Sequence, residues 1–160
     1  MIQLFGSKKL VGLDIGANCI KLVELSKSRK SITLEKIDVI HSPDKSYVNG
    51  DLLNIEEIAG AVTELFAKTK ANKKTVSVAL NGAQVVVKKI SIPKIDEKLL
   101  AEQLKWEAEQ YIPYELSEVN LDYNVLKYSE DPGSMSVLVV AALREAISKN
   151  LEMATMSGIG

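Results

Sequence analysis

The residues best suited to chemistry lie near the start of the chain, at positions 11–21. An apolar segment ends on the carboxylate of Asp14, Gly16 follows two residues later, and Lys21 comes five residues after Gly16. A hairpin with this spacing can hold phosphates and a metal ion. The small residue permits the bend, backbone N–H groups and the lysine bind phosphate oxygens, and the carboxylate binds the cation. The same residues also fit a tight hairpin with a solvated Asp and Lys, so both interpretations stay open.

Three consecutive strands joined by tight turns are expected to position these residues. Each is short, rich in aliphatic residues and bounded by turn residues. Their expected ranges are 11–15, 19–26 and 31–40. Because strands joined by such short turns pair antiparallel, the sheet is expected to begin as a meander.

Side-chain alternation assigns faces within these strands. It places Lys21 on the same face as Val23 and Leu25, where a lysine either extends its ammonium group to solvent or meets an anion. In the third strand the apolar parity changes between Leu34 and Ile37, which predicts a β-bulge.

A polar loop over 41–53 leads to a predicted amphipathic helix. Asn54 has the side chain of an N-cap, and Glu57 stands in the capping-box position. Six apolar residues at helical spacing form a stripe that is expected to pack on the sheet: Ile55, Ile58, Ala59, Val62, Leu65 and Phe66. A further strand over 75–80 is expected to end at the turn Asn81-Gly82.

From residue 83 onward the pattern predicts a compact β-α-β-β unit. Its expected elements are a strand at 84–92, a helix at 96–112, and strands at 119–127 and 135–143, with a loop at 129–134. A last helix over 144–157 is expected to carry Ile147, Leu151 and Ala154 on one face, and Gly158 stands at its C′ position.

The predicted helix at 96–112 is apolar on two sides. One arc of the helical wheel holds Leu100, Leu104, Ala108, Tyr111 and Ile112. Leu99 and Trp106 fall on the opposite side, so this helix is expected to pack twice. Its second contact is either the first lobe or a partner protein that covers Trp106.

At 160 residues the chain suits one ordinary domain or two small lobes. Its hydrophobic content of 46% and charged content of 26% are those of a globular protein. A net charge of −1 argues against a nucleic-acid partner. No apolar run approaches the roughly 20 residues of a membrane span. The single cysteine, Cys19, and the single histidine, His41, exclude a disulfide framework and a His/Cys metal cluster, so a cytosolic protein is expected.

Charge is unevenly distributed along the chain. Residues 1–30 hold six bases and two acids, whereas residues 94–131 hold four bases and ten acids. Such blocks are usually solvated faces, and a membrane surface or an acidic partner is the alternative for the basic end.

Several stretches resemble the family of PilM, the actin-like cytoplasmic component of type IV pilus assembly machinery. They are Leu-Val-Gly-Leu-Asp-Ile-Gly at 10–16, Ile-Lys-Leu-Val-Glu-Leu at 20–25, Trp-Glu-Ala-Glu-Gln-Tyr-Ile-Pro at 106–113 and Glu-Val-Asn-Leu-Asp-Tyr at 118–123. The third is the most specific, because the wider actin, Hsp70 and sugar-kinase superfamily shares the phosphate hairpin. The resemblance extends over about 10–160.

The resemblance implies an actin-like (RNase H-like) α/β fold, in which a mixed sheet with helices carries an inserted β-α-β-β subdomain. The inner subdomain would span 8–82 together with the returning helix at 144–160. The insert at 83–143 would be an SHS2-like subdomain, similar to that of PilM and of the division protein FtsA.

The resemblance also implies a cofactor site but no catalytic residue. The family's first phosphate loop maps onto Asp14, Gly16, Ala17, Asn18 and Lys21. Asp14 would meet the Mg²⁺ shell, Lys21 would meet the phosphates of ATP, and the N–H groups of the turn would complete the cradle.

PilM-like proteins bind the short cytoplasmic N-terminus of the membrane protein PilN in a groove between the two subdomains. They thereby couple the PilN/PilO platform of the inner membrane to the motor ATPases. The resemblance thus implies a nucleotide-responsive scaffold, recruited by its partner to the cytoplasmic face of the inner membrane. An actin-like ATPase, a sugar-kinase-like phosphotransferase and an FtsA-like filament-forming division protein remain as alternatives.

The chain departs from the family in length. A complete PilM-like chain is about twice as long, with a second lobe that carries another phosphate loop and the adenosine pocket. No second acid-x-glycine hairpin that could serve as this loop follows residue 82. ATP and Mg²⁺ are therefore expected to bind well only with the second lobe, and hydrolysis by this chain alone is not expected. The chain is expected to be a fragment, whose uncovered apolar surface could support a homodimer.

Overall fold

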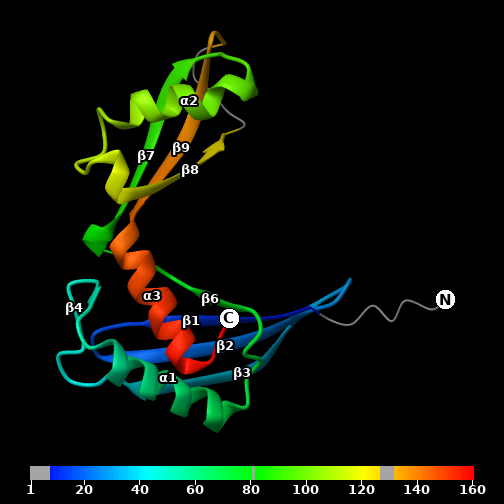
Figure 1. Ribbon diagram of the computed structural model, residues 1–160. Helices are drawn as coiled ribbons and strands as arrows, with labels where there is room; N and C mark the ends of the chain where they lie inside the picture. Colours follow the sequence, from blue (N-terminus) through cyan, green and yellow to red (C-terminus); the bar gives the residue numbers. More distant parts are fainter. Residues whose placement is uncertain (1–7, 81, 127–131) are drawn as a thin grey trace. The chain divides into compact units, whose positions relative to one another are not determined.

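The computed structural model describes residues 8–80, 82–126 and 132–160 (Figure 1). The chain divides into two compact units. Unit 1 comprises Met1–Leu80 together with Ser148–Gly160, and unit 2 comprises Asn81–Ile147. Part of the loop expected at 129–134 and the end of the strand expected at 119–127 lie outside the described residues.

Unit 1 is built on a four-stranded mixed sheet with the strand order β3-β2-β1-β6. Its strands are β1 (Lys8–Ile15), β2 (Cys19–Lys27), β3 (Ile32–His41) and β6 (Val76–Val78). Consecutive strands β1, β2 and β3 pair antiparallel, whereas β6 joins β1 in parallel. The predicted meander is therefore confirmed.

The predicted β-bulge is also present. Between Glu24 and Leu25 the partner residue on β3 changes from Lys36 to Leu34. Glu35 is thus the extra residue, and it accepts a hydrogen bond from the hydroxyl of Ser26. An extra residue shifts the alternation of side chains along β3 by one position. The apolar residues after the bulge therefore change from even-numbered to odd-numbered positions.

Helix α1 (Ile55–Thr69) begins at the predicted N-cap. The Asn54 side chain accepts a hydrogen bond from the backbone N–H of Glu57 at 3.2 Å. In a capping box the Glu57 carboxylate would accept a hydrogen bond from the backbone N–H of Asn54. This part of the prediction is wrong, because the carboxylate accepts instead from the Ser46 hydroxyl at 2.7 Å. The backbone N–H of Asn54 donates to the Ser46 carbonyl oxygen at 3.3 Å, so Ser46 satisfies both groups.

The expected polar loop at 41–53 contains a small hairpin, β4 (Tyr47–Val48) and β5 (Asp51–Leu52). Its turn residues Asn49 and Gly50 have positive φ values of 52° and 92°. Asn-Gly is the preferred dipeptide for such a two-residue turn, because both positions need φ > 0. The dipeptide is visible in the sequence and was the missed signal.

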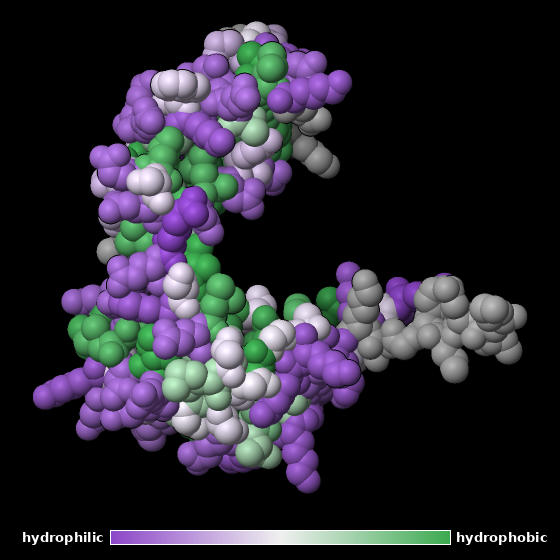
Figure 2. Space-filling model, in the orientation of Figure 1, coloured by the Kyte–Doolittle hydropathy of each residue, from purple (hydrophilic) through white to green (hydrophobic). Residues whose placement is uncertain are grey.

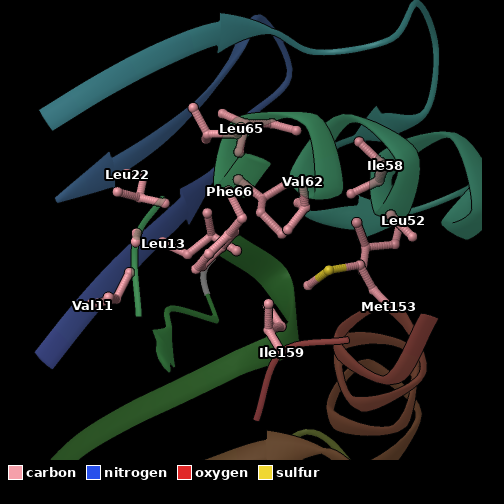
Figure 3. Packing of buried hydrophobic residues seen from close by; sticks show 14 residues of the cluster. Val11, Leu13, Leu22, Leu52, Ile58, Val62, Leu65, Phe66, Met153 and Ile159 are labelled. Atoms are coloured by element: carbon pink, nitrogen blue, oxygen red, sulfur yellow. The ribbon is translucent and has the colours of Figure 1, made fainter. Parts of the chain in front are cut away.

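The core of unit 1 forms where α1 and α3 (Arg144–Ser157) pack on one face of the sheet (Figure 3). Five of the six residues in the predicted α1 stripe are buried, and Ile55 packs against them. Of the apolar residues expected on one face of α3, Ala154 packs against this core, whereas Leu151 is 63% exposed; Met153 and Ser157 are buried. The Ser157 hydroxyl lies 3.3 Å from the Ala59 carbonyl oxygen, which fixes that face against α1. Gly158, with φ 65°, ends α3 as predicted.

An exposed ion pair links α1 to β3. The ammonium group of Lys68 lies 2.9 Å from Asp38 Oδ2, and the backbone N–H of Val39 donates to Asp38 Oδ1 at 2.8 Å. The hydrogen bond from Lys68, followed by that from Val39, lowers the pKa of Asp38 from its ordinary value of 3.8. A pKa lower in the folded state gives stability that is present above the unfolded-state pKa and is lost as the pH falls through the folded-state pKa.

We therefore expect Asp38→Asn to lower the urea midpoint slightly at neutral pH, because the variant lacks this contribution. The difference from the wild type is expected to vanish in acid below the folded-state pKa, where Asp38 itself is neutral. Urea unfolding followed by circular dichroism at both pH values measures it. A difference that persists unchanged in acid would contradict the role of the ion pair.

Unit 2 is a β-α-β-β arrangement with a three-stranded antiparallel sheet in the order β7-β9-β8. Its elements are η1 (Gly82–Gln84), β7 (Val85–Pro93), α2 (Glu97–Ala108), η2 (Leu116–Glu118), β8 (Val119–Val125) and β9 (Ser134–Leu143). Helix α2 packs on one face of the sheet through Leu100 and Leu104. It ends at Ala108 and not at Ile112 as predicted. The backbone N–H groups of Tyr111 and Ile112 both donate to the Ala108 carbonyl oxygen, at 3.0 Å each, and this turn leads into Pro113.

The outer side of α2 is solvent-exposed. Trp106 is 72% exposed and Leu99 is 59% exposed. Tyr111, predicted on the buried arc, is 46% exposed because it follows the end of the helix. On the face in view in Figure 2, hydrophilic residues predominate and apolar residues surface in small groups. Within the described residues, no helix has the length and apolar character needed to cross a bilayer.

Candidate functional site

Asp14 and Lys21 lie opposite each other at the closed end of the β1–β2 hairpin. They are Cα partners in the strand register, and their neighbours Leu13 and Leu22 are buried. Because side chains alternate, Asp14 and Lys21 project together from the face of the sheet that points away from the core. The Lys21 ammonium group donates to Asp14 Oδ2 at 2.9 Å, and both side chains are about half exposed (53% and 51%).

The turn between β1 and β2 is held by a hydrogen bond within the hairpin and by two hydrogen bonds from Ser42. The backbone N–H of Gly16 donates to the Cys19 carbonyl oxygen at 3.1 Å. A Cβ at position 16 would lie 3.2 Å from that oxygen, so a larger residue would crowd the turn. Ser42, which follows β3, donates its hydroxyl to the Gly16 carbonyl oxygen at 2.6 Å and its N–H to the Asn18 carbonyl oxygen at 3.1 Å.

These contacts decide which groups of the turn can meet a ligand. Gly16 contributes its small size, since its N–H is already used. The backbone N–H groups of Ala17 and Asn18 have no hydrogen-bond acceptor among the described residues, and both residues are exposed. A bend with free N–H groups is the feature that binds phosphate oxygens in such turns.

The electrostatics of the pair keep the lysine charged. The hydrogen bond with Asp14, together with the charge of Asp14, raises the pKa of Lys21 above its ordinary value of 10.5. In the structure each charge neutralises the other. A ligand that brings both an anion and a cation, such as a metal-bound phosphate, could replace both halves of this pair.

The donor set fits Mg²⁺ bound to phosphates. Carboxylate oxygen is the ligand type that Mg²⁺ takes from proteins, and this ion usually keeps several waters and binds phosphates as well. In the part of the chain that the structure describes, no group of three or more His, Cys, Asp or Glu side chains could enclose a metal ion. Asp14 could contribute one carboxylate to such an ion, with phosphate and water completing the shell.

All five predicted site residues thus belong to one hairpin end, and the structure brings Asp14 and Lys21 into contact. Their role in binding ATP and Mg²⁺ stays a prediction. Ser42 was not predicted, although it holds the turn. Nothing in its local sequence marks it, because its approach depends on the β2–β3 register.

Comparison with known proteins gives two kinds of match. The family model described as the type IV pilus assembly protein PilM matches residues 12–160. A chain in the solved structure of a PilM–PilN type IV pilus biogenesis complex is 30% identical, with a TM-score of 0.83 over 96% of this chain. This chain spans 46% of that chain's length, which is less than half.

A second solved structure shares the fold alone. The cytoplasmic domain of EpsL, an inner-membrane component of the type II secretion system of Vibrio cholerae, is 14% identical with a TM-score of 0.58. The match covers 95% of this chain and 54% of that chain.

Proposed function

Because the chain belongs to the family of the type IV pilus assembly protein PilM, we propose that it is part of a nucleotide-responsive scaffold that binds the cytoplasmic tail of a PilN-like membrane protein. The observation that carries the proposal is the match to the PilM–PilN complex over 96% of the chain. Binding to such a tail would place the protein at the cytoplasmic face of the inner membrane. There it would link the assembly platform to the motor ATPases.

The proposal assigns nucleotide binding to the β1–β2 hairpin. Lys21 and the free N–H groups of Ala17 and Asn18 would hold phosphate oxygens, and Asp14 would orient the metal ion through one oxygen. Mg²⁺ would neutralise phosphate charge when bound. Since this chain supplies one side of such a site, tight binding of ATP would need a second lobe that covers the base and ribose.

Tail binding can be tested by fluorescence anisotropy. The probe is a fluorescein-labelled peptide with the cytoplasmic N-terminal residues of the PilN-like protein encoded by the same organism. We expect saturable micromolar binding to the longest reading frame that includes this chain, and none of a scrambled peptide. Absence of binding up to several hundred micromolar would overturn the proposal.

The paired Asp14 and Lys21 also favour a second candidate, an actin-like ATPase or phosphotransferase. This candidate predicts steady phosphate release from ATP, with or without a sugar acceptor, that disappears in Asp14→Ala. The scaffold predicts nucleotide binding with little turnover. Sedimentation of the same protein with ATP distinguishes both from a filament former and reports a homodimer.

A further inference from the structure

One face of the unit 1 sheet is apolar and exposed. It is the face opposite to the core, and the strand register aligns its residues in rows across β1, β2 and β3. We call it the open face, and its most exposed aliphatic residues, between 48% and 69% exposed, are Leu10, Ile32, Leu34, Ile37 and Val39. A contiguous exposed apolar surface of this kind usually marks a contact site.

Gly12 leaves a notch in the middle of the open face. It is an exposed residue in the interior of β1, directly opposite Val23. A Cβ at position 12 would meet one atom within 4 Å, the Val23 carbonyl oxygen at 4.0 Å, so packing among the described residues does not require a glycine there. Because glycine weakens a strand interior, it often marks the close approach of another group. The notch is therefore a second sign that the open face receives an external group.

The charges of the open face favour an acidic occupant. Lys21 lies at its hairpin end and Lys27 at its other end, and both are exposed. Among the described strand residues on this face Asp14 is the one acid, and it is already hydrogen-bonded to Lys21. A second open face would bring lysines against lysines and is a poor match.

The outer side of α2 has the matching chemistry. Leu99 and Trp106 are seven residues apart, so they lie within about 20° of each other around the helix. The nearest charged residues of α2 on either side of them are Glu102 and Glu107, and the lysines of α2 lie further round. A helix with an apolar stripe on a sheet face is the common way to complete an α/β layer. The two surfaces thus match in shape, polarity and charge.

We propose that α2 of one copy of this chain docks on the open face of a second copy, with the Trp106 indole at the Gly12 notch. Because the two surfaces differ, the contact is heterologous, and association can continue beyond a dimer. A twelve-residue helix is only about 18 Å long, so the contact is small and the association weak. The inference goes beyond the proposed function and requires neither a bound tail nor nucleotide.

Trp106 is the only tryptophan of the chain, so its fluorescence reports on the contact. Between about 5 and about 500 µM protein at low salt, we expect its emission maximum to shift to the blue as the mean sedimentation coefficient rises, as for a weak interface. Leu99→Ala and Ile37→Thr should each abolish both changes. Leu151→Ala, which truncates an equally exposed leucine on α3, is the matched control and should retain them. Emission and sedimentation that do not change with concentration would overturn the proposal.

Three further variants test the orientation of the contact. Lys27→Glu and Glu102→Lys should each weaken association about threefold, and an equimolar mixture of the two proteins should recover it, because each then offers the other a complementary surface. If the open faces paired with each other, Lys27→Glu would instead strengthen association and Glu102→Lys would have no effect. Gly12→Val should abolish association by filling the notch, while the thermal midpoint stays the same or rises. A lower midpoint with association intact would contradict the role of the notch.

Discussion

Replacement of Lys21 by alanine is expected to weaken binding of Mg·ATP about 10- to 100-fold in a protein that includes the second lobe, because a charge-assisted hydrogen bond to phosphate is lost. Lys21 is the cation at the end of the hairpin, where its ammonium group already contacts Asp14 at 2.9 Å. Lys21→Arg keeps the charge and should retain part of the affinity. Isothermal titration calorimetry with ATP, with and without Mg²⁺, measures the change.

Lys27→Ala is the matched control for this experiment. Lys27 lies on the same strand and, by alternation, on the same face as Lys21, but at the opposite end of the strand. Six residues of strand place it roughly 20 Å from Lys21, too far to reach a phosphate held at the turn. Equal affinities for the Lys21→Ala and Lys27→Ala variants would contradict a phosphate role for Lys21. Because the Asp14–Lys21 pair is half exposed, Lys21→Ala should leave thermal stability almost unchanged.

Most of the fold could be predicted because its signals are local. Two-residue alternation predicts the strands of the meander, and helical spacing predicts the buried stripe of α1. The resemblance correctly implied the actin-like fold class with its inserted β-α-β-β subdomain. Local spacing fails for α3, whose apolar residues do not form one clean stripe. Its orientation is decided by tertiary contacts, such as that of Ser157 with Ala59, which the chain makes across 98 residues.

The candidate site likewise has residues that local spacing predicts and residues whose role depends on tertiary contacts. The spacing of Asp14, Gly16 and Lys21 predicts one hairpin end, and the β1–β2 register places the two charged groups together. Ser42 lies 26 residues from the carbonyl group that it holds, so only the folded sheet reveals its role. Glu24 is different, because alternation alone places it on the core face with Ile20 and Leu22, and its burial was a missed inference.

Glu24 is a buried carboxylate held between two lysines. Its side chain is 1% exposed, Lys36 Nζ lies 3.2 Å from its Oε2, and Lys9 Nζ lies 3.7 Å from its Oε1. The Lys36 contact is an ion pair without a hydrogen bond, since Glu24 Oε2 has no hydrogen-bond partner among the described residues. Lys36 also donates to the carbonyl oxygen of Lys70, the C-cap of α1. One ammonium group therefore serves both a buried charge and a helix end.

Lys36→Met is expected to destabilise the chain by about 2–3 kcal/mol, because it leaves the buried carboxylate with Lys9 alone and removes a donor from the end of α1. Glu24→Leu should cost much less, since it removes the buried charge itself and Lys36 can still reach Lys70. Denaturant unfolding followed by circular dichroism measures both free energies.

The double variant Glu24→Leu/Lys36→Met separates the two effects of Lys36. If compensation of the buried carboxylate dominates, the double variant should be about as stable as Glu24→Leu alone, because the methionine no longer strands a charge. If the contact with the end of α1 dominates, the loss caused by Lys36→Met should persist without Glu24. Lys27→Met, at an exposed position on β2, controls for the loss of a surface charge and should be nearly neutral. A loss for Glu24→Leu as large as that for Lys36→Met would contradict the asymmetry, and would mean that the carboxylate stabilises the sheet by more than its burial costs.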